Sequence, residues 1–250
     1  FGVRGERPSH PELLDWLASR FREAKFSVKE IHRLIMNSAA YRRSSRFDES
    51  AAESDPDARL LWRFNRRRLS AEEIRDSILF VSGDLDLSFG GAHPFPAEAS
   101  WTSFSQHSPF YGLYPSRRRS LFLMQQRLKR HPFLALFDGA DPNVSTPRRE
   151  LTTVPTQSLY LMNSEFVHRQ SAVLADRVLA GSASRSERLQ RGWRMTLGRA
   201  ASEQERLEAE KFLLAYTESL GEAGGDRTHQ VAWSALMRTL LTRNEFLFVD

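Results

Sequence analysis

A repeated helix-start signal, Ser-x-x-Glu followed by apolar residues at helical spacing, constrains this chain most strongly. It occurs as Ser9–Glu12, Ser27–Glu30, Ser70–Glu73, Ser184–Glu187 and Ser202–Glu205. In such a capping box the Ser oxygen accepts from the amide three residues on, and the Glu reaches back to the cap amide. Apolar side chains then recur every three or four residues, as at Leu13, Leu17 and Phe21. These five helix starts predict a mainly helical chain.

Two further segments have a helical apolar period without a capping box. One is predicted over 156–179, just after Pro155, and the other over about 229–243. Alternation of the kind that strands show is nearly absent, apart from Phe246–Val249 at the end. We therefore predict a mainly α, multi-helix fold with little or no sheet and one long irregular loop.

The chain has 250 residues, 40% of them hydrophobic, which suffices for one sizeable core. We expect a single helical domain over 1–250, and because the sequence opens on Phe1 we expect it to be a fragment of a longer chain. The alternative is two helical subdomains, 1–88 and 117–250, joined by the irregular segment 89–116.

The segment 89–116 is rich in Gly, Pro, Ser and aromatic residues. A loop of this length is functional, ordered by packing, or an insertion. Aromatic faces stack on sugar rings, which makes Trp101, Phe104 and Tyr111 candidate carbohydrate-stacking residues. They could equally fill space beneath the loop. One alternative function is therefore an extracytoplasmic carbohydrate-binding or hydrolytic unit.

A second irregular stretch precedes the helix predicted over 156–179. Free amides at a helix N-terminus attract anions, and neighbouring arginines add to that attraction. The candidate ligand or anion site, placed within 138–163, comprises Arg148, Arg149, Thr156, Gln157 and Asn163. The alternative is a loop-to-helix junction at which the Gln and Asn side chains satisfy buried backbone groups.

Metal chemistry has weak support. Asp138, Asp141 and Asn143 carry oxygen ligands, but their spacing is not that of an EF-hand and turn formation explains them better. No two histidines lie three or four residues apart, so His93, His107 and His131 would meet only through the fold. We expect no metal. Cysteine is absent, which excludes thiolate sites, disulfides and covalent haem attachment in this stretch.

Positive charge is only mildly in excess, with 36 Lys and Arg against 31 Asp and Glu. The arginine-rich run 59–68 holds Trp62 and Phe64, which could serve as stacking platforms in a nucleic-acid-binding module. Pairing of these arginines with the carboxylates of 48–57 is the better explanation, so we do not expect nucleic acid as a partner. Neither a nucleophile-elbow motif nor a phosphate-binding glycine loop is present, and catalysis is left open.

Seven sequence segments, taken in order along the chain, carry a resemblance to a known family. They are SHPELLDWLASRF (9–21), IHRLIMNSAAYRRSS (31–45), LLWRFNRRRLSAEEIRDSIL (60–79), SGDLD (82–86), RRRSLFL (117–123), RRELTTVPTQSLYLMN (148–163) and NEFLFVD (244–250). Together they resemble the planctomycete "PSD-one" domain of unknown function. That domain lies at the C-terminal end of large cytochrome c-like proteins.

The resemblance implies a setting rather than a reaction. It places the chain in an exported multidomain protein, periplasmic or beyond, with haem on an upstream domain and no cofactor in this fragment. It implies that upstream domains of the parent chain are the partners. The residues discussed above add a saccharide or an anion as a further candidate ligand. No catalytic residues carry over from the family. No run reaches the ~18 apolar residues of a membrane span. The function expected is a non-catalytic helical module.

Overall fold

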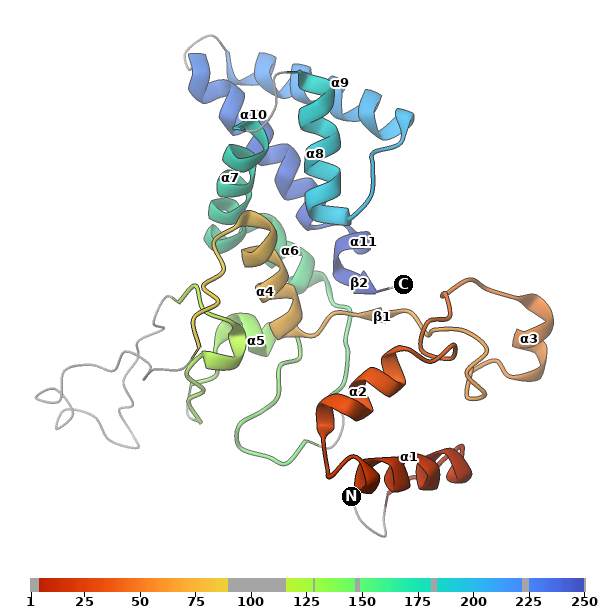
Figure 1. Cartoon of the computed structure of the whole chain (residues 1–250). Coiled ribbons are helices and arrows are strands. Elements are labelled where there is room, and N and C mark those ends of the chain that lie inside the picture. Colours follow the sequence, from red (N-terminus) through yellow and green to blue (C-terminus); the bar gives the residue numbers. More distant parts are fainter. Residues whose placement is uncertain are drawn as a thin grey trace, which may run out of the picture. The chain divides into compact units, whose positions relative to one another are not determined.

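The computed structural model describes residues 5–89, 116–127, 129–146, 149–180, 184–221 and 225–249, and it confirms the mainly α prediction (Figure 1). The helices are α1 (Pro11–Glu23), α2 (Val28–Met36), α3 (Glu49–Ser54), α4 (Ala71–Ser82), α5 (Pro132–Leu136), α6 (Pro155–Asn163), α7 (Glu165–Leu179), α8 (Arg185–Leu197), α9 (Glu203–Leu220), α10 (Gly225–Leu241) and α11 (Asn244–Leu247), with a 3₁₀ turn η3 (Ser120–Phe122). Two short strands, β1 (Arg67–Arg68) and β2 (Phe248–Val249), form the sheet of the described part. Within the described residues, no helix combines the length and the apolar character that a membrane crossing requires.

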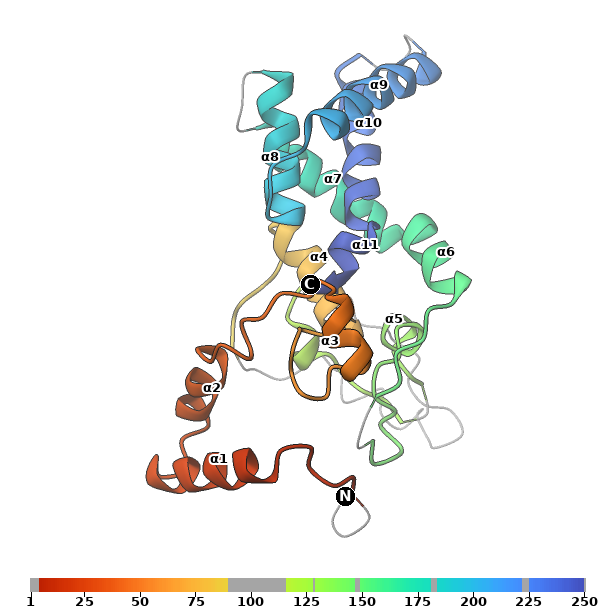
Figure 2. The same cartoon turned by 90° about the vertical axis from the view of Figure 1, so that its right-hand side faces the viewer.

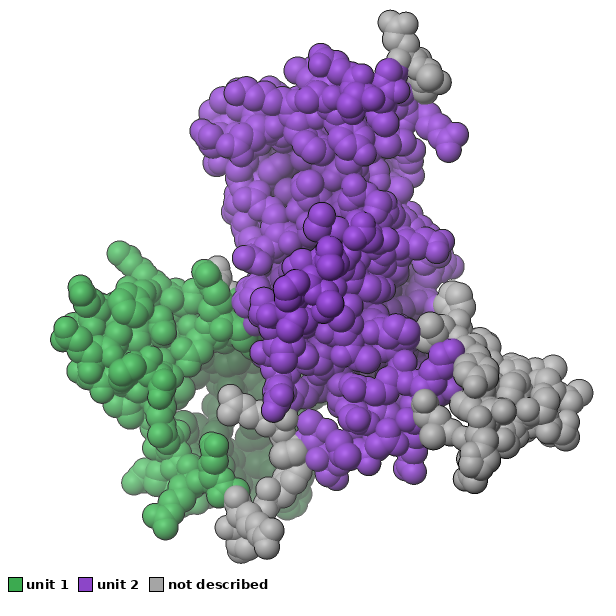
Figure 3. Space-filling model, turned by 180° about the vertical axis from the view of Figure 1, so that it is seen from behind, with its two compact units in different colours: residues 1–67, 249–250 green, residues 68–248 purple. Residues whose placement is uncertain are grey.

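The chain forms two compact units, which Figure 3 distinguishes by colour. Unit 1 comprises 1–67 with 249–250, and unit 2 comprises 68–248. Helices α1, α2 and α3 belong to unit 1, and all later helices belong to unit 2. The single-domain expectation, and its alternative of subdomains 1–88 and 117–250, stay predictions.

Three of the five predicted capping boxes form completely, at Ser70, Ser184 and Ser202. Ser27 caps α2 by accepting from the Glu30 amide at 3.4 Å. The prediction at Ser9 is wrong, because α1 begins one residue later, with His10 as its N-cap and no side-chain cap bond. A residue that precedes proline is disfavoured in the helical region, so the helix begins at Pro11 itself.

The single helix predicted over 156–179 is also wrong. The chain leaves helical geometry at Ser164, whose ψ of 128° separates α6 from α7. Just before the break, the Asn163 side-chain amide donates to the Leu159 carbonyl at 3.0 Å. Asn and Ser side chains compete with backbone helical bonds in this way, which explains why an unbroken apolar period does not give an unbroken helix.

Unit 2 contains the hydrophobic core, and α10 is its central element. Helix α10 lies beside α7 in Figures 1 and 2 and also packs on α8, α9 and α11, while α4 packs on α7 and α5. Trp233 and Met237 of α10, Leu174 of α7 and Ile78 of α4 are almost completely buried. Burial of such side chains contributes about 1.5–3 kcal/mol each, so this unit has the means to fold cooperatively.

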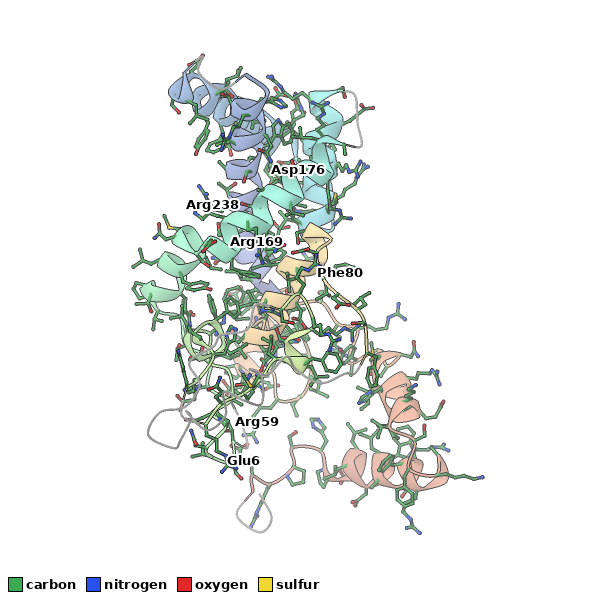
Figure 4. The ribbon with its side chains drawn as sticks, turned by 90° about the vertical axis from the view of Figure 1, so that its left-hand side faces the viewer. Glu6, Arg59, Phe80, Arg169, Asp176 and Arg238 are labelled. Carbon is green, nitrogen blue, oxygen red and sulfur yellow. The ribbon has the colours of Figure 1, made fainter. Side chains whose placement is uncertain are left out.

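Polar bonds fix the register of α7 against α10. Near one end of the contact, the Gln230 amide donates to Asp176 at 3.0 Å, and near the other Arg238 donates to Nδ1 of His168 at 2.7 Å. Figure 4 labels Asp176 on α7 and Arg238 on α10. His168 Nε2 donates in turn to the Met162 carbonyl at 2.9 Å, so the His168 ring joins both helices to the end of α6.

Candidate functional site

Unit 1 has almost no interior. Of its described residues 5–67, Asp55 and Ala58 alone are buried, and neither α1 nor α2 contains a buried residue. Yet both helices carry an apolar stripe, which on α2 runs through Val28, Ile31 and Ile35. A helix of this kind gains most of its stability from packing that stripe against another surface. In unit 1 this stripe is only partly covered, since Ile31 and Ile35 are half-buried and Val28 is 55% exposed.

The partly covered stripes line a hollow of about 1150 Å³, here called the unit 1 groove. Its apolar lining includes Leu13 and Leu17 of α1, Ile31, Leu34 and Ile35 of α2, and Leu61 from the segment after α3. Leu13 and Leu34 keep 43% and 38% of their surface exposed although they point into this lining. The groove is therefore an accessible apolar surface.

A tight connection sets α1 against α2. Lys25 and Phe26 adopt left-handed conformations, with φ of 50° and 62°, and the Phe26 amide donates to the Phe21 carbonyl at 2.8 Å. The Phe21 and Phe26 rings then meet edge to face at 5.4 Å. A left-handed Phe is costly, so this turn persists because the surrounding contacts determine it.

A buried carboxylate fixes the segment 55–64 beside these helices. Asp55 accepts from the backbone amides of Arg59 (3.0 Å) and Leu60 (2.7 Å). The Trp62 indole N–H donates to the Asp55 carbonyl at 2.7 Å. These three bonds hold the Trp62 ring in one place, and the residue that follows is held with it.

That residue is Arg63, which lines the groove. Its guanidinium lies 4.7 Å from the Trp62 ring centroid and 5.4 Å from that of Phe47. The Arg63 Nε atom is shielded from solvent and has no hydrogen-bond partner among the described residues. The sequence predicts that the arginines of 59–68 pair with carboxylates of 48–57, but Arg63 stacks on aromatic rings instead.

Charged residues of both signs line the groove. Four arginines and two glutamates contribute: Arg20, Arg33, Arg63, Arg67, Glu23 and Glu30. Each glutamate is already paired within its own helix, Glu23 with Arg20 at 2.8 Å and Glu30 with Arg33. Both carboxylates of the lining are thus paired, and Arg63 is a further positive charge in the same lining.

Unit 2 offers a second hollow, of about 1040 Å³, along α4. Its carboxylates have partners within the fold. Glu72 pairs with Arg149 at 2.6 Å, and Asp76 accepts from the Ser120 amide at 2.8 Å. Glu245, also in the lining, pairs with Arg199. These polar groups therefore tie structural elements together, in contrast to Arg63 in the unit 1 groove.

One family model matches most of the chain. Residues 1–213 match PSD1, described as a protein of unknown function (DUF1553). The chain belongs to the PSD1 family. No curated protein and no solved structure matches it. The family description names no reaction, so the function of this PSD1 domain has to be inferred from its own residues.

The structure disperses the predicted anion-site residues of this PSD1 domain. Arg148 lies outside the described residues. Arg149 pairs with Glu72, and both Thr156 and Asn163 are exposed, at opposite ends of α6. Gln157 is buried instead. The anion site stays a prediction, and no described contact assembles its members around a common point.

Gln157 belongs to a polar cluster that sequence reasoning missed, here called the Arg68 cluster. The buried Arg68 guanidinium donates to Gln157 Oε1 at 2.8 Å and to Asp138 Oδ2 at 2.7 Å, and also to the Thr152 carbonyl. Gln157 donates to the Leu136 carbonyl at 3.0 Å. Three segments meet here, at Arg68, at 136–138 and at 152–157, so no local motif signals the cluster.

Two of the weak metal candidates have partners of their own. Burial acts to raise the pKa of Asp138, but hydrogen bonds from Thr152 and Arg68 outweigh it, so that pKa is below its ordinary value. Asp141 accepts from the Asn143 amide at 2.9 Å, the hydrogen bond of an Asx turn. In the described part of the chain, no three His, Asp or Glu side chains gather as metal ligands would.

The remaining predicted residues fall into two groups. The carbohydrate candidates Trp101, Phe104 and Tyr111, with His93 and His107, lie outside the described residues. His131 is half-buried at the start of α5. Burial, and the nearby charge of Arg75, lower the pKa of His131, which keeps its ring neutral at physiological pH.

Proposed function

We propose that this PSD1 domain is a non-catalytic interaction module that binds another polypeptide in the unit 1 groove. The observation that carries the proposal is that α1 and α2 have apolar stripes and no buried residue. Exposure of such stripes to water is unfavourable by about 25 cal/mol for each Å² of apolar surface. A bound partner would remove that cost.

The exposure of the groove, more than its size, favours a polypeptide over a small ligand. Small-molecule sites in proteins enclose about 300–1,000 Å³ and bury most of the ligand. The unit 1 groove reaches about 1150 Å³ and is open to solvent along exposed side chains such as Leu13 and Leu34. Contiguous exposed apolar surface of this kind commonly marks a protein interface.

The partner we propose is the upstream region of the parent protein. The sequence phrases that resemble the PSD-one domain support an exported, multidomain setting in which haem lies on an upstream domain. The absence of cysteine from this chain agrees with covalent haem attachment elsewhere in that protein. In this proposal the fragment itself carries no cofactor, and docking joins it to the part of the protein that does.

Calorimetric titration of the 250-residue chain with the separately expressed upstream region tests this function. Micromolar or tighter binding is expected. The variant Leu13→Ser with Leu34→Ser removes two side chains from the groove and should weaken binding at least tenfold, since burying a leucine side chain contributes about 1.5–3 kcal/mol and about 1.4 kcal/mol corresponds to a factor of ten in affinity. Leu207→Ser with Leu220→Ser is the matched control, because these α9 residues are equally exposed, at 44% and 40%, and lie outside unit 1.

Two results would count against the proposal. Absence of binding by a cooperatively folded chain would make the domain autonomous. Equal weakening by the α9 control would show that the loss is not specific to the groove.

A further inference from the structure

We propose that the unit 1 groove recognises an amphipathic helix that carries a carboxylate, and that Arg63 is the residue that receives it. This inference rests on the proposed function, because it names the chemistry of the partner that the same groove would bind. Three observations carry it: the state of the Arg63 guanidinium, the charge of the lining, and the arrangement of the apolar stripes.

The Arg63 side chain is held ready for an acceptor. Its guanidinium stacks on Trp62 and lies beside Phe47, and Trp62 is itself fixed by its bond to Asp55. The Nε atom is shielded from water without an acceptor among the described residues. An unsatisfied buried donor is costly, and more so when it is charged. A carboxylate that enters the groove can accept charge-assisted hydrogen bonds from the guanidinium Nη groups of Arg63, which lines it.

The other charged residues of the lining favour a partner that carries an anionic group. Glu23 and Glu30 already pair with Arg20 and Arg33, so they offer little to a cationic ligand. Arg63 adds a positive charge to the same lining. An anionic group placed beside Arg63 would meet a complementary field, whereas a cationic one would be repelled.

The apolar stripes favour a helix as the bound element. Leu13 and Leu17 of α1 and Ile31 and Leu34 of α2 line one hollow from two sides. Helices commonly bury such stripes against a further helix, whose side chains fit between their ridges. A third helix along the groove would cover both stripes at once. One acidic residue on its flank would then reach Arg63.

The test repeats the titration against the upstream region with Arg63→Gln, using Arg46→Gln as the matched control. Arg46 is an exposed arginine of the same unit that does not line the groove. Arg63→Gln should weaken binding by about tenfold or more, as loss of a charge-assisted pair predicts, while Arg46→Gln should not. Raising the salt from about 50 to 300 mM should weaken the wild type more than Arg63→Gln, because an ion pair is screened.

A second variant distinguishes loss of the Arg63 charge from loss of folding. Arg63→Lys keeps the charge but not the paired donors, so its affinity should lie between the wild type and Arg63→Gln. If Arg63→Lys binds no more tightly than Arg63→Gln, the positive charge at this position does not contribute to binding, and the inference is wrong.

The outcomes separate this inference from the proposed function. If the Leu13→Ser, Leu34→Ser variant weakens binding but Arg63→Gln does not, the groove is a docking site and the carboxylate is not its ligand. If neither variant has an effect, both proposals fail. A concentration-dependent dimer that the leucine variant abolishes would assign the groove to a second copy of this chain and would overturn the inference.

Discussion

The Arg68 guanidinium donates a 2.7 Å hydrogen bond to the carboxylate of Asp138, 70 residues further along the chain. Both side chains are largely buried, at 6% and 16% exposure. Asp138 adopts a left-handed conformation, with φ of 62°, and accepts a second bond from the Thr152 amide at 2.9 Å. This ion pair therefore joins the end of α5 to the loop before α6 and to the start of unit 2.

Removing the Asp138 carboxylate should destabilise unit 2 strongly. Asp138→Ala removes the carboxylate from its 2.7 Å ion pair with the buried Arg68 guanidinium, which costs about 3 kcal/mol or more. Asp138→Asn should lose less, because Asn tolerates the left-handed conformation and can still accept a hydrogen bond. Urea unfolding measures both. Asp15→Ala, on the exposed face of α1, is the control and should stay within about 0.5 kcal/mol of the wild type; an equal loss there would refute the account.

Glu205 should stabilise the packing of α9 through its charge. Its carboxylate pairs with Arg199 at 2.7 Å and Arg243 at 3.1 Å, and it closes the capping box with Ser202. Glu205→Gln keeps an acceptor for the cap but loses the charge, so we expect about 1–2 kcal/mol of destabilisation. Ser202→Ala breaks the cap alone and should cost about 1 kcal/mol.

The effect of Glu205→Gln should depend on pH. The hydrogen bond from Arg199 holds the pKa of Glu205 well below its ordinary range. A depressed carboxyl pKa stabilises the fold above the unfolded value of about 4.3, and that stabilisation is lost as the pH falls further. The difference between wild type and Glu205→Gln should therefore shrink below about pH 4. A difference that stays constant to pH 3 would contradict the role of the charge.

His131 should make unit 2 sensitive to mild acid. Burial and the Arg75 charge lower its pKa, so the folded state prefers the neutral ring. The unfolded chain binds a proton below about pH 6.5, and stability should fall as the pH drops from there. His131→Phe removes this titration and should flatten the fall between about pH 6.5 and 5. Thermal unfolding at several pH values measures it, and parallel curves for the two proteins would rule out this cause.

Much of the helical framework could be predicted because its signals are local. The boxes at Ser70, Ser184 and Ser202 use residues three apart, and all three form. The break at Ser164 was missed because the apolar period continues across it. The Arg68 cluster was missed because its partners lie 70 to 89 residues away, where no spacing rule applies.

The groove shows another limit of sequence reasoning. The apolar period of α1 and α2 could be seen in the sequence, and it correctly predicts two amphipathic helices. Periodicity gives the direction of an apolar stripe but not whether the rest of the chain covers it. Only the fold shows that Leu13 and Leu34 stay exposed, and that Arg63 lies beside them without an acceptor among the described residues.

Hydrogen exchange of the backbone amides, with and without the upstream region of the parent protein, tests the central claim most directly. Docking in the unit 1 groove predicts slower exchange across 11–36, which holds α1 and α2, because a covered helix opens less often. Unit 2 should exchange as before. Slowing confined to unit 2, with α1 and α2 unchanged under saturating partner, would contradict the claim that this groove is the binding surface.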